Sequence, residues 1–461
     1  MRAQNDLHSS HVDGPFCTVT IKNVEEVCSF LGPKDVCFIS QDDKAQIPIG
    51  ITAANKQAPI LMHMEYRVSL PDHDWVIAAK HKLIPSVYAG IAIKPDGLGK
   101  SDAVSHSGPT YVAIRSGKHS SSTAYAHGLD FERLLTLPEF DSITKDPLTK
   151  LVKPVVVFSV DGRSDENPRY AKVIEIAIHH FLTNDLDALL IMTNAPGRSA
   201  FNRAEKRMAP LSKELAGLIL PHDHYGTHLD SKGRTVDLLL DKQNFKFAGN
   251  SCASVFSGLM IDQFPTVAEY IDPDNKTELD VHHLLSKDQD WFASHVRTSQ
   301  YFKQIVKCED PACCALKRSS YLHVIPGRFL PPPIPISQSE NGLKAVAISD
   351  VASKNRFSSV FFLIASNIQS TIPRSLISFK LPPYDLFCPS VQSSLSQRIC
   401  KHCNLYFASQ VMLKKHVSVT HSNVINQMAI TFSQIRPVCI AAKRKRELMA
   451  VIAIKENAAF A

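Results

Sequence analysis

Three acidic side chains stand where a divalent cation could bind. Asp42 and Asp161 each follow a short apolar run, and Glu205 follows a polar loop after a third such run. Mg²⁺ prefers hard oxygen ligands and keeps several waters, so a few carboxylates on rigid elements are enough to bind it. Two such ions about 3.5–4 Å apart can activate an attacking oxygen and stabilise a leaving oxygen when a phosphodiester is cut. The acids therefore predict metal-assisted phosphoryl-transfer chemistry.

Two strands and the helix between them must position Asp161 and Glu205. Residues 155–160 are apolar and mostly β-branched, which predicts a buried strand ending at Asp161. A helix is expected to open at Asn167-Pro168, and a second buried strand is expected over residues 188–192. Glu205 should lie on the helix that follows. Because a strand, helix, strand order gives a parallel pair with a right-handed crossover, both strands end at one edge of the sheet.

The third acid, Asp42, is predicted at the end of an earlier strand. Residues 36–41 form an apolar run that leads into it, residues 47–51 alternate as a second strand, and residues 60–68 have the pattern of a third. These segments predict an antiparallel meander that begins the sheet. Asp42 and Asp161 are expected on adjacent strands.

These acidic blocks resemble those of a known family. The residues that carry the resemblance are Asp42-Asp43-Lys44, then Asp161-Gly162 with Asn167-Pro168, then Ala195-Pro196 with Asn202 and Glu205. They look like the three blocks of DDE transposases of the ribonuclease H-like superfamily, especially mariner-type and related eukaryotic elements. The resemblance spans roughly residues 36–220. It implies an α/β fold, with a ribonuclease H-like mixed sheet flanked by helices.

The resemblance also implies the chemistry and the residues that perform it. Asp42, Asp161 and Glu205 would be the catalytic metal ligands, and Mg²⁺ or Mn²⁺ would be the cofactor. The reaction would be two-metal phosphodiester cleavage and strand transfer on DNA. Taken singly, an aspartate at a strand end is usually a turn or cap residue, and a glutamate in a first helical turn usually complements the helix dipole. Their order on the right elements favours the catalytic interpretation.

Two other functions remain open from the sequence. A domesticated descendant of such an enzyme would keep the fold and bind DNA or proteins without cutting. A zinc-finger regulator would use the large N-terminal portion only as an interaction platform. Intact acids favour the enzyme. The lack of a recognisable helix-turn-helix before residue 36 favours the domesticated descendant, because an active enzyme must recognise DNA ends somewhere.

Composition limits the class of protein. The chain has 461 residues, of which 44% are hydrophobic and 21% charged, which is ordinary for a soluble protein of two or three domains. The 51 lysines and arginines exceed the 44 acids, a mild excess that is compatible with nucleic-acid binding. There is no secretory signal and no apolar run of membrane-spanning length. An intracellular, nuclear protein with DNA as its partner is expected, and a second copy of the chain is a further candidate partner.

The C-terminal part carries a metal-binding pattern. Cys400-x2-Cys403-x12-His416-x4-His421 has the spacing of a C2H2 zinc finger, which predicts a small ββα unit that binds Zn²⁺. Phe407 and Leu413 occupy its two apolar core positions. The base-reading positions would be Ser409, Met412 and Lys415. Because a lone finger reads about three base pairs, nonspecific DNA contact or protein contact is the expected role.

Other cysteines and histidines leave alternatives open. Cys308-x4-Cys313-Cys314, with His295 nearby in sequence, could form a small zinc site or be buried thiols. The histidines of residues 222–228 could bind a metal or make loop hydrogen bonds. The basic run 443–446 could be an import signal, a phosphate contact or a solvated charge cluster.

The domain organisation expected from these features has five parts. Residues 1–35 would be a lead-in that could be the remainder of a longer region, and residues 36–325 the catalytic domain with insertions. Residues 326–397 would be a proline-rich linker with an unassigned segment, residues 398–422 the finger and residues 423–461 a basic tail. Within the catalytic domain, Ser101–Ser122 is expected as a loop excursion, and residues 267–307 as helical.

Overall fold

The structure has two units that are described separately. The computed structural model describes residues 11–51, 53, 77–198, 201–275, 279, 281, 288–339, 342–346, 356–365 and 382–421. The first unit covers Met1–Ser396 and the second covers Gln397–Ala461. No helix among the described residues is long and apolar enough to cross a membrane.

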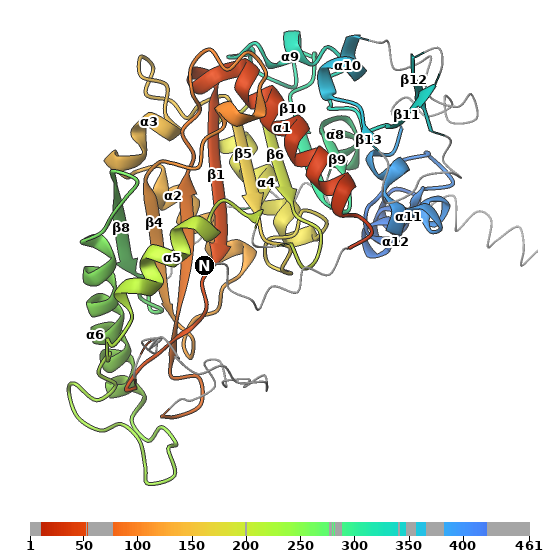
Figure 1. Ribbon diagram of the computed structural model, residues 1–461. Coiled ribbons are helices and arrows are strands. Elements are labelled where there is room, and N and C mark those ends of the chain that lie inside the picture. The colour runs from red at the N-terminus through yellow and green to blue at the C-terminus, as the bar shows by residue number, and fades with distance from the viewer. Residues whose placement is uncertain are drawn as a thin grey trace, which may run out of the picture. The chain divides into compact units, whose positions relative to one another are not determined.

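A ten-stranded mixed sheet forms the centre of the first unit (Figure 1). Its strand order is β7-β8-β4-β3-β1-β5-β6-β10-β9, with β2 paired to β3. The strands are β1 Val36–Asp43, β2 Ile47–Pro48, β3 Lys82–Gly90, β4 Thr110–Ser116, β5 Val155–Val160, β6 Ala188–Thr193, β7 Met260–Ile261, β8 Phe264–Tyr270, β9 Val296–Thr298 and β10 Phe302–Val306. Strands β1, β5 and β6 are parallel, whereas β3 is antiparallel to both β1 and β4.

Helices cover both faces of this sheet. They are α1 Gly14–Asp35, α2 Ala124–Leu134, α3 Asp141–Thr144, α4 Ala171–Thr183, α5 Glu205–Glu214, α6 Leu238–Ser257, α8 Gln289–His295, α9 Tyr321–Val324, α10 Val360–Ala365 and α11 Pro389–Gln392. A small separate sheet consists of β11 Pro335–Ser339, β12 Gly342–Ala345 and β13 Arg356–Phe357. A mixed α/β architecture with helices flanking one large sheet was expected, and the structure confirms it.

The two faces of the sheet are buried against different helices. On one face, α1 packs on β1, β5 and β6 through Phe16 and Val24, and α5 and α6 pack on β3 and β4 through Leu211 and Phe245. On the other face, Phe131 of α2 lies edge-on against Phe158 of β5, with ring centroids 4.9 Å apart. Burial on both faces explains why β5 and β6 have near-continuous apolar sequences rather than alternating ones.

The predicted strand, helix, strand unit is present. Strand β5, helix α4 and strand β6 follow one another, and β5 and β6 pair in parallel. Helix α4 ends at Asn184, after which Asp185 adopts a positive φ of 48°. An aspartate tolerates this left-handed conformation better than most residues do, so it can end a helix there.

The beginning of the sheet differs from the prediction. Residues 47–51 contribute only the two-residue strand β2, and the expected strand 60–68 lies outside the described residues. The antiparallel meander is formed instead by β1, β3 and β4. Strand β4 lies within Ser101–Ser122, which was wrongly expected to be a loop. Its apolar core of residues 111–114 is short, and the serines, glycines and histidines on both sides hid it.

Two expected flanking segments are also parts of the first unit. The expected lead-in 1–35 contains α1, whose residues Phe16, Val24 and Val27 are buried against the sheet. The helical backbone is interrupted at Gly32, which has φ of 78°, before Pro33. The expected linker 326–397 contributes Leu386 to the same core. Short apolar runs separated by polar residues conceal this packing in the sequence.

The prediction that residues 267–307 are helical is mostly wrong. It contains β8, β9 and β10, and α8 is its one helix among the described residues. Strand β10 is buried throughout, although it contains Lys303 and Gln304. Polar residues inside a buried strand removed the apolar pattern that predicts one.

The described residues of the second unit form a short antiparallel bridge followed by a helix. Ile399 and Tyr406 form the bridge, and α12 spans Gln410–Thr420. Phe407 and Met412 are buried in this unit. The basic run 443–446 lies outside the described residues.

Candidate functional site

The three predicted acids lie at one edge of the sheet. Strand β1 pairs with β5 in parallel, with Ser40 beside Ser159, and Asp42 and Asp161 each lie two residues further along the chain. Glu205 is the first residue of α5. Because side chains alternate along a strand, Asp42 shares a face with Ser40, and this is the face that α5 covers.

The electrostatics show that these acids are close enough to repel each other. Burial first, and then the negative charges of Asp161 and Glu205, raise the pKa of the Asp42 carboxyl from 3.8 to about 8. Only 3% of Asp42 is exposed, so little solvent screens the charges. A carboxyl with this pKa is mainly protonated at neutral pH, and a bound divalent cation would favour its ionised form.

Asn202 positions the start of α5 against the sheet. Its side-chain nitrogen donates to the carbonyl oxygen of Gln41 over 2.8 Å, and its side-chain oxygen accepts from the hydroxyl of Ser40. The Ser40 hydroxyl also accepts from the backbone nitrogen of Ala204 over 3.0 Å. These contacts attach the residues before Glu205 to the end of β1, so Asn202 fixes where the third acid lies.

Lys44 and Arg163 bring positive charge to the acids. Burial lowers the pKa of Lys44, and the charge of Glu205 opposes that shift. The Arg163 guanidinium lies 3.2 Å from a carboxylate oxygen of Asp161. Burial lowers the pKa of Arg163, but Asp161 and Asp42 raise it more, so the pKa is raised overall. In this state Arg163 partly balances the acidic cluster.

Asp43 faces the opposite side of the sheet from Asp42. It pairs with Ser86 of β3, whose hydroxyl donates to its carboxylate over 2.6 Å. On that side its carboxylate converges with His127 of α2 and Asp165, and the possible ligand atoms of these three residues lie within 4.8 Å of one another. The alternation expected for neighbours on a strand therefore separates Asp42 from Asp43.

Glu166 is a buried acid that the sequence reasoning missed. Its carboxylate accepts from the backbone nitrogen of Asp161 over 3.0 Å and from the Gln41 side chain over 3.2 Å. Burial raises its pKa well above the usual value, and the charges of Asp43 and Asp42 raise it further. The signal was available, because Glu166 directly precedes Asn167-Pro168 in the second acidic block.

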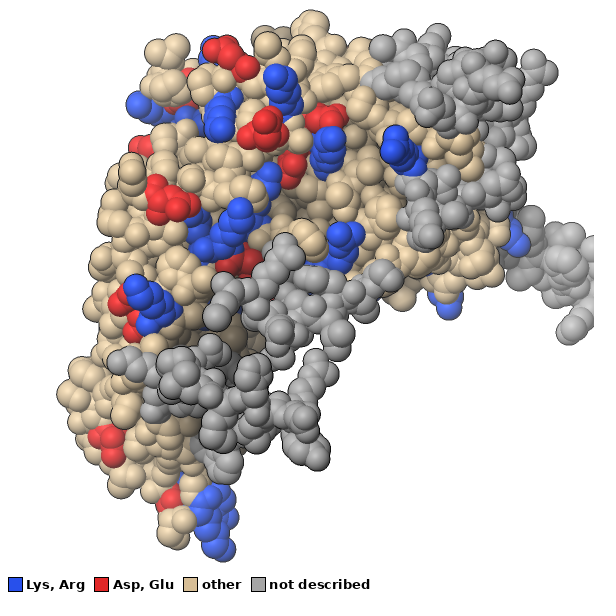
Figure 2. Space-filling model, viewed as in Figure 1, with Lys and Arg blue, Asp and Glu red and all other residues tan. Residues whose placement is uncertain are grey.

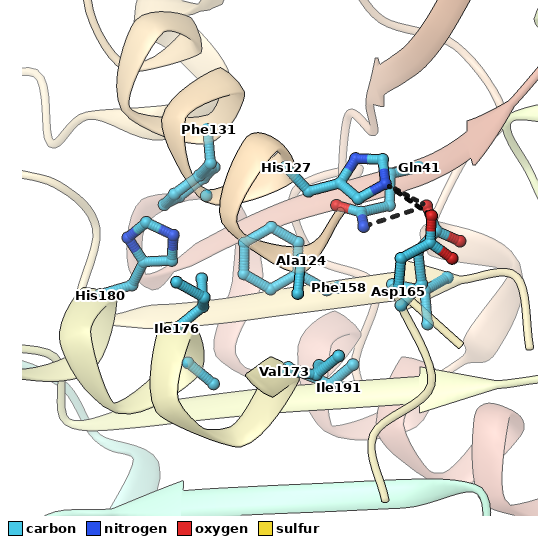
Figure 3. Close-up of a pocket in the computed structure, with 14 residues that line it drawn as sticks. Gln41, Ala124, His127, Phe131, Phe158, Asp165, Val173, Ile176, His180 and Ile191 are labelled. Carbon is cyan, nitrogen blue, oxygen red and sulfur yellow. Dashed lines mark hydrogen bonds and ion pairs between the residues drawn. The ribbon is translucent and has the colours of Figure 1, made fainter. Parts of the chain in front are cut away.

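A small pocket on the α2 side has one polar and one apolar end (Figure 3). At the polar end, His127 lies 3.7 Å from Asp165 and 3.6 Å from Glu166. At the apolar end, His180 lies against Phe131. The His127 Nδ1 is 2.6 Å from the hydroxyl of Tyr88, which fixes the orientation of the imidazole. The polar end of this pocket is thus linked to the acids through Glu166.

The histidines of residues 222–228 do not form one metal site. His228 is buried, with its Nε2 2.9 Å from Asp241 and 2.8 Å from His81. His224 instead stacks on Phe247, with ring centroids 3.5 Å apart. The ammonium group of Lys118 lies 2.5 Å from Asp241, so a cation already balances that carboxylate.

The four predicted finger ligands come together in the second unit. The possible ligand atoms of Cys400, Cys403, His416 and His421 all lie within 4.8 Å of one another. Cys403 Sγ is 3.2 Å from His416 Nε2. Two thiols and two imidazoles at this separation form the tetrahedral donor set that Zn²⁺ prefers.

The acids fit hard divalent cations by donor chemistry and by charge. All three are carboxylates, and their mutual repulsion is the condition that a bound cation relieves. They are not among the described sets whose ligand atoms all lie within 4.8 Å of one another.

Comparison with known proteins gives no match. No family model matches the chain, and no curated protein or solved structure matches it.

Proposed function

We propose that this protein is a DDE transposase-like enzyme that cuts and joins DNA strands with two divalent metal ions, on a ribonuclease H-like fold. One observation carries the proposal. Asp42, Asp161 and Glu205 come from three distant segments, yet the charges of Asp161 and Glu205 act on Asp42, and burial together with these charges raises the pKa of Asp42 to about 8. Such a costly arrangement of acids is typical of a functional site.

Each residue of the site has a role in this proposal. Asp42, Asp161 and Glu205 would hold Mg²⁺ or Mn²⁺, which supplies activation of the attacking oxygen and stabilisation of the leaving oxygen. Asn202 holds the helix start that carries Glu205. Arg163 is more than half exposed beside Asp161, so it can turn from that carboxylate toward a phosphate of the substrate.

The proposed substrate is DNA. Lysines and arginines are interspersed with acids on the face that Figure 2 shows, rather than gathered in one broad basic surface. Positive charge is nevertheless present beside Glu205. The pKa of His106 is lowered to about 4, first by burial and then by Arg203, Lys206 and Arg207. Of these three, Lys206 is exposed and suits contact with a phosphate backbone, whereas Arg203 and Arg207 are buried and pair with Glu25 and Asp262.

The second unit is proposed to be a C2H2 zinc finger. Its bridge, its helix α12 and its converged Cys400, Cys403, His416 and His421 support this assignment. Acting alone, it would contribute nonspecific DNA contact or protein contact. DNA as the substrate implies that the protein works in the nucleus, and a second copy of the chain could supply a second active site at paired DNA ends.

The test is metal-dependent nicking of supercoiled DNA by the full chain. Asp161→Asn and Glu205→Gln keep the side-chain size but remove the charge that offsets the metal. Nicking in Mg²⁺ or Mn²⁺ should fall roughly a thousandfold or more, because a metal contributes several kcal/mol to the transition state. DNA binding, measured at fixed salt, should survive. The control is Glu269→Gln, a surface carboxylate that pairs with Arg133.

Two results would contradict the proposed enzymatic activity. If the wild-type chain binds DNA but cuts nothing in either metal, the protein is a DNA-binding descendant without catalysis. If the Asp161 and Glu205 variants cut as fast as the control, nicking comes from other residues or from a contaminant.

A further inference from the structure

A second set of thiol and imidazole groups converges in the first unit, away from the acids. The possible ligand atoms of His295, Cys308, Cys313 and Cys314 all lie within 4.8 Å of one another. His295 is the last residue of α8, Cys308 follows β10, and the other two cysteines lie in the next turn. Two segments of the chain, the end of α8 and the segment after β10, therefore meet at this point.

The distances agree with a tetrahedral zinc centre. With Zn–S bonds of about 2.3 Å and Zn–N bonds of about 2.0–2.1 Å, ideal separations are about 3.8 Å between two sulfurs and about 3.6 Å between sulfur and nitrogen. Cys308 Sγ lies 3.6 Å from Cys314 Sγ. His295 Nε2 lies 3.6 Å from Cys313 Sγ and 3.3 Å from Cys314 Sγ. A single ion could contact all four groups with little movement.

The imidazole of His295 is already oriented as a ligand. Its Nδ1 lies 2.8 Å from the carbonyl oxygen of Trp291, which can only accept a hydrogen bond, so Nδ1 carries the proton. The ring also stacks on the Trp291 indole, with centroids 4.3 Å apart and planes 11° apart. The unprotonated Nε2 then faces the thiols. Metal-binding histidines are usually fixed by such a hydrogen bond to a backbone carbonyl.

The alternative of buried structural thiols does not fit this segment. Cys313 is exposed and Cys308 and Cys314 are half-buried, whereas Cys17, Cys28 and other cysteines of the first unit are buried. The same segment exposes 89% of Leu316. Hydrophobic burial is therefore a weak reason for three thiols to meet here.

The surrounding protein fixes both ends of the cysteine segment and supplies compensating charge. Lys307 Nζ lies 3.0 Å from Asp187 at one end, and the backbone nitrogen of Arg318 donates to Asp187 over 2.8 Å at the other. Arg328 donates to the carbonyl oxygens of Lys307 and Ser294, next to two of the ligands. A Zn²⁺ ion with three thiolates has a net charge of about −1, which this guanidinium would complement.

We propose that His295, Cys308, Cys313 and Cys314 bind one Zn²⁺ ion as a closed structural site. Four protein ligands leave no open position for substrate, so the site stabilises the fold and does no chemistry. It ties the end of α8 to the segment after β10, and thereby holds β9 and β10 at the edge of the sheet. It is independent of the acids and of the finger.

Zinc content of the full chain tests this site. All variants are made in a background chain that carries Cys400→Ser and Cys403→Ser, so that two of the finger ligands are absent. Each protein is dialysed against excess Mg²⁺ before its zinc is measured. Adding Cys313→Ser and Cys314→Ser should lower the retained zinc by about one ion per chain. Glu309→Gln, an exposed acid in the same segment, is the matched control and should leave the zinc content unchanged.

A second measurement keeps the proposal testable if the serine variants fold poorly. Cys314→His puts an imidazole ligand in place of the thiol, so the variant should still bind zinc. When Co²⁺ replaces that zinc, the variant should show weaker thiolate-to-cobalt absorption than the chain that keeps Cys314. Equal zinc in the folded background and in its double-serine derivative would overturn the proposal. So would a disulfide between Cys308 and Cys314 in protein that was never exposed to oxidant.

Discussion

The acidic site and the thiol sites differ in how the fold and the metal depend on each other. Asp42, Asp161 and Glu205 are far apart in sequence and repel one another, and the sheet, with Asn202, holds them together before any metal binds. The ligands of the second unit lie between residues 400 and 421, within a segment too short to bury a core of its own. In the proposed acidic site the fold would position the metal ions, whereas in the proposed finger the zinc ion would hold the fold together.

This contrast predicts opposite signs for the loss of a ligand. Removing a carboxylate from the acidic site relieves repulsion, so it should stabilise the metal-free protein while abolishing function. Removing a thiol from a zinc site should destabilise the unit that the zinc holds. The two classes of variant therefore separate a functional metal site from a structural one.

The largest expected effect is the unfolding of the finger by chelation. Structural zinc contributes about 10–16 kcal/mol in finger peptides, which exceeds any other contribution to a unit of this size. A peptide of residues 398–422 should lose its helix when a chelator is added, as followed by circular dichroism. Cys403→Ser should behave like the chelated peptide, and Lys401→Ala, at an exposed non-ligand position, should not. Helix content that is unchanged by the chelator would show that zinc does not hold this segment folded.

A smaller effect is expected for Asp42→Asn, and its sign is the informative part. The folded chain keeps the Asp42 proton up to a pH of about 8, whereas the unfolded chain releases it near its ordinary value of 3.8. The unfolded state therefore binds fewer protons between these pH values, so this carboxyl lowers stability as the pH rises. At pH 8.5 the free energy of unfolding of the variant should exceed that of the wild type by roughly 2–4 kcal/mol. At pH 3.5 the two should be equal.

Denaturant unfolding with and without Mg²⁺ completes this test. Mg²⁺ should stabilise the wild type at pH 8.5, because it binds the folded state, and should stabilise Asp42→Asn much less. A variant that is less stable than the wild type at pH 8.5 without metal would mean that Asp42 has a structural role and is not part of a strained metal site.

Asn202→Ala tests whether activity needs the position of Glu205 as well as its charge. The variant leaves the Gln41 carbonyl and the Ser40 hydroxyl without their partner, which should cost about 2 kcal/mol of stability. Nicking should fall roughly a hundredfold even where the variant is fully folded, because Glu205 is no longer held in place. The matched control is Asn184→Ala, which loses one hydrogen bond at the end of α4. Equal nicking rates for the two variants would exclude a positioning role.

Much of the acidic site was predictable because it follows local rules. Strand β5, helix α4, strand β6 and Glu205 at a helix start are all signalled by short apolar runs, breakers and caps. Strand β4 was missed because its apolar core is short, and β10 because Lys303 and Gln304 interrupt it. His127 carries no signal in the sequence, and Glu166 is signalled only by its place directly before Asn167-Pro168. They join the site only because α2 packs on the far face of β5, which no local pattern reports.

The smallest effect is expected for Asp43→Asn, which tests which face of β1 carries the chemistry. Asp43 pairs with Ser86 and points to the α2 side, away from Asp161 and Glu205. An asparagine oxygen can still accept from the Ser86 hydroxyl, so stability should change by no more than about 1 kcal/mol. Nicking should fall less than about tenfold, against roughly a thousandfold for Asp42→Asn.

The reverse result would also be interpretable. Asp43, His127 and Asp165 place possible ligand atoms within 4.8 Å of one another, so the α2 face offers a metal site of its own. If Asp43→Asn abolishes nicking and Asp42→Asn does not, the ion binds there. His127→Asn should then remove activity as well, whereas Glu205→Gln should not. Parallel nicking assays of these four variants decide between the two faces, because each face predicts loss of activity in a different pair.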